Sequence, residues 1–132
     1  MITRLVAAPS VASLAHQQYG LSRPARLAAR DGFVYGIYEL TRSFPTQETY
    51  GLTAQLRRSA VSVASNIAEG EGRLTRGERR QALSQARGSL FEIETQLLLA
   101  RRLGYKSSDG ADDRVAELRR MLDAYIVYVR KR

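Results

Sequence analysis

Apolar residues recur every three or four positions through most of this chain, and no run alternates strictly between apolar and polar residues. Such spacing places apolar side chains on one face of an α-helix, whereas alternation is typical of a half-buried strand. The spacing predicts helices over about residues 22–44, 46–69, 75–103 and 111–130. Four amphipathic helices with short connections predict an all-α fold, an antiparallel up-down-up-down four-helix bundle.

Residues at the expected helix ends support these boundaries. Pro45 excludes its predecessor from helical geometry and ends the first helix. Thr75 and Glu78 fit a capping box at the start of the third helix. Gly70 with Gly72 is expected to end the second helix, and Gly104 the third, because glycine readily adopts the conformation that follows a helix.

The inner faces of the helices define a predicted core of apolar side chains. Its members are Phe33, Val34, Ile37, Leu40 and Phe44; Leu52, Leu56, Ala60, Val63 and Ile67; Leu83, Ala86, Leu90, Ile93, Leu97 and Ala100; and Val115, Leu118, Leu122, Tyr125 (or Ile126) and Val129.

The length of 132 residues suits one domain. Residues 1–23 lack the helical period and are predicted to be a poorly ordered or peripheral extension, with the bundle over 24–132. The charge-free run 5–22 contains proline, glycine and glutamine, so it is too polar to span a bilayer. It faintly imitates a signal peptide, but a poorly ordered extension is favoured over an export signal.

No residues of the sequence assemble an active site by recognisable spacing. There is no cysteine, and His16 is the one histidine. The glycine-rich stretch 70–73 follows no predicted strand and lacks the Gly-Lys-Ser/Thr of a phosphate loop. We therefore expect no catalytic residues, no metal site and no cofactor.

The formal charge is +8, and 19 of the 21 basic residues are arginine. The guanidinium fork matches phosphate, so a polyanion partner is one interpretation. The other is a codon bias toward arginine, with charges that only solvate helix faces. The candidate nucleic-acid-binding residues are Arg57, Arg58, Arg73, Arg76, Arg79, Arg80, Arg101 and Arg102.

Small and polar residues form a second candidate set, for structure or an interface. Asn66 and Glu69 lie three positions apart and can touch along one helix edge, either as a partner contact or as a polar pair that ties the helix to a neighbour. Glycine weakens a helix interior, so Gly88 (with Ser89) is expected to let another backbone approach, and Gly70, the expected helix stop, belongs to the same structural or interface set.

Several short motifs occur in a fixed order: Phe44-Pro45, Tyr50-Gly51-Leu52, Gln55-Leu56-Arg57-Arg58, Ser62 with Asn66-Ile67-Ala68-Glu69-Gly70, Gly88-Ser89-Leu90, Glu94-Thr95-Gln96-Leu97 and Leu103-Gly104-Tyr105. In this order they resemble the family of four-helix-bundle proteins encoded within 23S ribosomal RNA intervening sequences. Two departures are Ala64, where relatives often have proline, and the absence of the tryptophan usual in their first helix.

The resemblance implies a cytoplasmic protein that forms a ring-shaped homo-oligomer, a pentamer in the relatives. A distant branch resembles accessory proteins of diversity-generating retroelements, which bind nucleic acid and a reverse transcriptase. We therefore expect a non-catalytic scaffold associated with ribosomal RNA, other structured RNA or DNA. The alternative is a protein-protein interaction or structural bundle with no nucleic-acid role.

Overall fold

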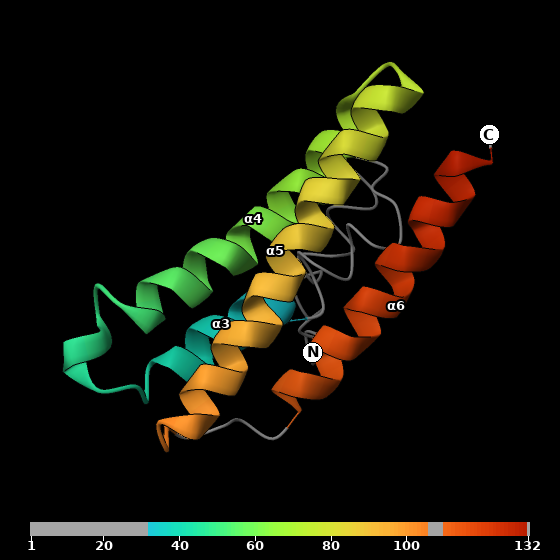
Figure 1. The fold of residues 1–132 in the computed structure, drawn as a ribbon. Coiled ribbons are helices and arrows are strands. Elements are labelled where there is room, and N and C mark those ends of the chain that lie inside the picture. Colours follow the sequence, from blue (N-terminus) through green and yellow to red (C-terminus); the bar gives the residue numbers. More distant parts are fainter. Residues whose placement is uncertain (1–31, 106–109, 132) are drawn as a thin grey trace, which may run out of the picture.

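The computed structural model describes residues 32–105 and 110–131, which form four α-helices and one 3-10 turn (Figure 1). The elements are α3 (Phe33–Thr41), η1 (Thr46–Glu48), α4 (Leu52–Gly72), α5 (Arg76–Arg102) and α6 (Ala111–Arg130). No strand occurs in these ranges, so the predicted all-α, four-helix fold is confirmed. The expected extension 1–23 and the expected start of the first helix lie outside the described residues.

Side-chain contacts show that α4, α5 and α6 alternate in direction. Ser62 Oγ lies 2.8 Å from Ser89 Oγ, and Ser59, earlier in α4, donates a 3.3 Å hydrogen bond to Glu92, later in α5. As the residue number rises along α4, the residue number of its partner in α5 falls, so the two helices are antiparallel. The pairs Arg87–Asp123 and Arg119–Glu94 give the same relation between α5 and α6.

The core lies on the predicted inner faces. Of the residues expected there, Val34, Leu52, Tyr125 and Ile126 are partly buried and pack against the core, and every other one is buried. The three-to-four-residue period therefore identified the buried side of each described helix correctly.

Helix α4 begins six residues later than its predicted start. Pro45 is followed by the 3-10 turn η1, and the Gly51 backbone then takes φ −105° and ψ −117°, which lies outside helical geometry. The helix consequently starts only at Leu52.

The predicted end of α4 at Glu69 is also wrong. Gly70, Glu71 and Gly72 continue the helix, and neither glycine has a positive φ. Gly70 is instead a buried contact point, because a Cβ added there would lie 3.4 Å from both the Ala82 Cβ and the Arg79 carbonyl oxygen.

Both ends of α5 agree with the sequence analysis. The Thr75 hydroxyl accepts a 3.2 Å hydrogen bond from the Glu78 amide, which is one half of the expected capping box. At the other end Gly104 has φ +79°, and the Tyr105 amide donates to the Ala100 carbonyl at 3.0 Å. This is the left-handed glycine termination that the sequence predicted.

Candidate nucleic-acid interface

The connection between α4 and α5 consists of residues 73–75 and lies at one end of the helical hairpin (Figure 1). Arg73 and Thr75 both have extended backbones, with ψ 144° and 151°. The Thr75 cap fixes the start of α5, so Arg76, Arg79 and Arg80 project from its first two turns.

The four arginines of residues 73–80 differ in how they are held. Arg73 forms an ion pair with Glu69, and this hydrogen bond together with the carboxylate charge raises the pKa of the Arg73 guanidinium. Arg79 is half-buried, and its Nε has no hydrogen-bond partner among the described residues. Arg76 and Arg80 are exposed and form no ion pair with any described residue, so their guanidinium groups face solvent.

Carboxylates moderate the charge of this turn. Residues 69–80 contain four arginines and three glutamates, which leaves a net charge of +1. Across residues 32–105 and 110–131 there are 15 of the 21 basic and 11 of the 13 acidic residues, a net +4 of the formal +8. The net charge of the turn is therefore small, and its positive charge is carried by the arginines that have no ion-pair partner among the described residues.

Arg57 is placed differently from the other predicted phosphate ligands. Its Nε donates to Thr41 Oγ1 at 2.9 Å, and its guanidinium lies over the Tyr38 ring at 4.6 Å from the centroid. Arg57 therefore ties α4 to α3 within one chain. Arg58, the next residue, is exposed and makes no ion pair in the described part of the chain.

Arg101 and Arg102 do not join the arginines of the turn. Arg101 forms an ion pair with Asp112 of α6, whereas Arg102 is exposed. A rise of 1.5 Å per residue separates Arg102 from Arg76 by about 39 Å along α5. The eight candidate arginines thus form one cluster, at the turn, and separate positions elsewhere.

Asn66 and Glu69 do not bond each other. Asn66 Nδ2 donates to the Ser62 carbonyl oxygen at 2.9 Å and to its hydroxyl at 3.1 Å, and that hydroxyl also contacts Ser89 of α5. Asn66 therefore supports a polar contact between α4 and α5, whereas Glu69 pairs with Arg73.

Gly70 and Gly88 have different surroundings. Gly70 lets α5 approach α4, a contact that was expected at Gly88 and not at Gly70. A Cβ added at Gly88 would meet nothing within 4 Å, and Gly88 is exposed. The expected close backbone at Gly88 is therefore absent from the described part of this chain.

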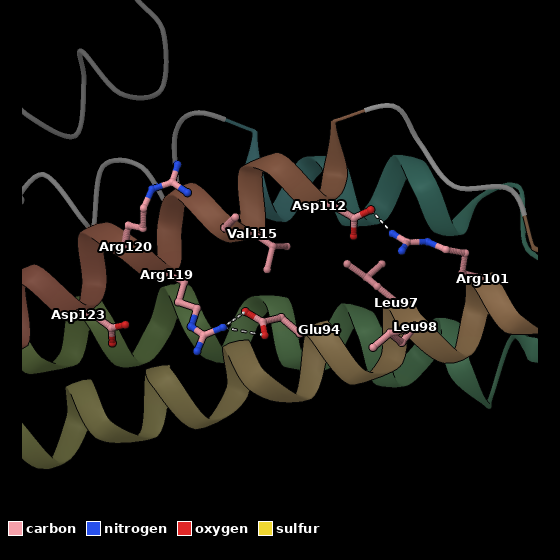
Figure 2. A pocket seen from close by; sticks show the side chains of 10 residues that line it. Glu94, Leu97, Leu98, Arg101, Asp112, Val115, Arg119, Arg120 and Asp123 are labelled. Atoms are coloured by element: carbon pink, nitrogen blue, oxygen red, sulfur yellow. Dashed lines mark hydrogen bonds and ion pairs between the residues drawn. The ribbon is translucent and has the colours of Figure 1, made fainter.

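A groove that the sequence analysis missed runs between α5 and α6 (Figure 2). Its volume is about 550 Å³, and Leu97, Leu98, Val115 and Ala116 supply apolar lining. Charged side chains rim it, with dashed contacts between Arg119 and Glu94 and between Arg101 and Asp112. Leu98 is 63% exposed. The helical period could have indicated this, because Leu98 is not among the predicted core positions of α5.

Next to this groove, Phe91 lies between two arginines. Arg87 and Arg119 stand 4.8 and 4.3 Å from the centre of its ring. Asp123 pairs with Arg87, and Glu94 pairs with Arg119. Both arginines are therefore engaged in joining α5 to α6.

Residues 32–105 and 110–131 contain no group of three or more His, Cys, Asp or Glu that could hold a metal ion. In the same ranges no helix is long and apolar enough to cross a membrane.

Comparison with known proteins identifies one family. The family of 23S rRNA-intervening sequence proteins matches residues 16–124, which include nearly all of the described fold. No curated protein is significantly similar to the chain. Since the match covers most of the sequence and agrees with the four helices, the chain belongs to the family of 23S rRNA-intervening sequence proteins.

Proposed function

We propose that the protein is a non-catalytic, cytoplasmic scaffold that binds structured RNA through the arginines of the α4–α5 turn. The observation that carries this proposal is the exposure of Arg76 and Arg80 without ion-pair partners among the described residues. An unpaired guanidinium can meet a phosphate without first breaking a salt bridge, and it offers two parallel donors to the phosphate oxygens.

We further propose that the scaffold is a cyclic homo-oligomer, a pentamer by family resemblance. Supporting features are the open space at Gly88 and the exposed Val61, Ser65 and Ala68 on α4, which leave a surface of short side chains. Cyclic repetition would multiply the +8 charge of each chain and bring several α4–α5 turns to one partner.

The test compares two double variants that lose the same charge. Arg76→Ala with Arg80→Ala removes the unpaired arginines of the turn, whereas Arg58→Ala with Arg102→Ala removes exposed arginines elsewhere. Binding of a labelled structured RNA is measured by fluorescence anisotropy between about 50 and 200 mM salt. The turn variant should flatten the salt slope by about two units, one for each lost phosphate contact, while the control stays near wild type.

Equal losses in the two variants would mean that binding follows total charge and not the turn. Both variants should keep the wild-type circular dichroism and melting temperature, because exposed unpaired arginines contribute little to stability. Absence of binding to RNA and DNA even at low salt would refute the nucleic-acid proposal.

The second candidate function is protein-protein interaction. The distant resemblance to retroelement accessory proteins suggests a reverse transcriptase as one such partner. The observation in its favour is the apolar groove between α5 and α6 with Leu98 at its edge. Leu98 is 63% exposed at this edge. An exposed leucine beside an apolar groove is typical of a surface for a partner helix.

A further inference from the structure

Leu74 is the most exposed large apolar residue in the described part of the chain. Its relative accessibility is 97%, against 63% for Leu98 and 51% for Leu99. Single exposed leucines are ordinary on protein surfaces. Leu74 differs because it lies at the tip of the α4–α5 hairpin, within three residues of Arg73 and Arg76 (Figure 1).

Hydrogen bonds hold the chain on both sides of Leu74. On one side the Arg73 amide donates to the Gly70 carbonyl at 3.4 Å, and on the other the Thr75 hydroxyl accepts from the Glu78 amide. With only three residues between two helices, and no glycine among them, the turn has little freedom to fold its leucine back onto the hairpin.

We propose that Leu74 packs against an unstacked base while Arg76 and Arg80 hold the adjacent phosphates. The preferred partner is then RNA with a bulged or unpaired nucleotide, rather than a continuous duplex. The assignment rests on the proposed function, since it uses the same arginines. It follows from the chemistry of apolar wedges, which enter a base step while neighbouring cations hold the backbone, and from the accessibility of unstacked bases in RNA loops and bulges.

A lipid surface fits the turn less well. The carboxylates of Glu69, Glu71 and Glu78 oppose anionic headgroups and RNA phosphates alike, so the comparison depends on apolar area. One leucine buries far less apolar area than the amphipathic helices that bind membranes. RNA, in contrast, needs only one apolar side chain at the unstacked base. Arg76 and Arg80 then bind the adjacent phosphates.

The experiment uses the full chain and two RNA hairpins that differ by a single bulged nucleotide, with 2-aminopurine beside the bulge. Wild type should bind the bulged hairpin about tenfold more tightly, slightly less than full burial of one leucine side chain would give. Leu74→Gln should abolish this preference and the fluorescence change, yet bind the continuous duplex as wild type does. Leu74→Met should retain both, because it keeps an apolar side chain.

Leu99→Gln is the matched control, since it removes an exposed leucine far from the turn and should keep the bulge preference. Wild type that binds both hairpins equally, or Leu74→Gln that keeps the preference, overturns the inference and leaves the arginine proposal intact. Leu74-dependent binding to anionic phosphatidylserine vesicles, with no bulge preference, overturns it in favour of a membrane partner. If the wild-type protein binds neither hairpin, both the role of Leu74 and the proposed RNA-binding function are refuted.

Discussion

Arg57 Nε donates a 2.9 Å hydrogen bond to Thr41 Oγ1, which in turn donates to the Ile37 carbonyl at 2.8 Å. Thr41 is only 3% exposed, so its hydroxyl would lack its charged donor if Arg57 were shortened. The two consecutive arginines of α4 therefore differ: Arg57 joins two helices, whereas Arg58 faces solvent.

Arg57→Ala should lower the free energy of unfolding by about 1–2 kcal/mol. The loss combines a hydrogen bond from a charged group with the cation–π contact on Tyr38, and solvent reduces both because Arg57 is only half-buried. Urea unfolding followed by circular dichroism measures the change.

Arg58→Ala is the control for this experiment and should stay within about 0.5 kcal/mol of wild type, as exposed positions usually do. If the two variants were equally stable, the contact between Arg57 and Thr41 would contribute nothing. If Arg57→Ala lost RNA binding without losing stability, Arg57 would be a phosphate ligand after all.

The fold could be predicted because its signal is repeated many times. In α5, every position from Leu83 to Ala100 that the spacing assigned to the core is buried. The roles of the arginines could not be predicted, because an arginine has the same local sequence signal whether it pairs across helices or faces water. Arg101 and Arg102 illustrate this, since only the position of Asp112 on α6 distinguishes them.

Helix ends were predicted unevenly for a related reason. The Thr75 cap and the Gly104 termination depend on contacts within a few residues, so the local sequence indicates them. The role of Gly70 depends on a tertiary contact, the approach of α5, which the local sequence does not indicate. Gly70 therefore remains helical where the sequence predicted a helix end. The open groove beside Leu98 likewise requires the placement of two helices.

Thr75→Ala should destabilise the protein by about 1 kcal/mol, because the Glu78 amide loses its capping acceptor. Thr75→Asp should keep the cap. Thr95→Ala is a suitable control, since its exposed hydroxyl donates only to the Phe91 carbonyl within α5. Thermal melts of the three variants test the prediction, and equal melting temperatures for Thr75→Ala and wild type would contradict it.

Arg119→Met should weaken the contact between α5 and α6 by about 1 kcal/mol. The substitution keeps an apolar stem but removes the ion pair with Glu94 and the cation over Phe91. Arg120→Met changes the next residue, which is exposed and has no ion pair in the described segments, and should cost much less.

Salt separates the electrostatic part of this effect. The stability difference between Arg119→Met and wild type should shrink as sodium chloride rises from about 0.1 to 1 M, because the Debye length falls from about 10 to 3 Å. A difference that stays constant with salt would assign the loss to packing around Phe91 alone.

Gly88→Ala tests the proposed oligomer. A Cβ at Gly88 meets no described residue within 4 Å, so alanine should stabilise an isolated bundle by about 0.5–1 kcal/mol through its higher helix propensity. If another subunit packs closely at this position, the added methyl group should instead shift the oligomer toward monomer at micromolar concentration.

Gly77→Ala provides the matched comparison, because Gly77 also lies in α5, is exposed and has open space around its Cα. Light scattering should give the wild-type mass for Gly77→Ala and a lower mass for Gly88→Ala. Denaturation under monomeric conditions should find both variants at least as stable as wild type, since neither methyl group meets a neighbour in the part of the chain that the structure describes. An unchanged oligomer in Gly88→Ala would place the subunit contact elsewhere, and a 14.7 kDa wild-type monomer would exclude the ring.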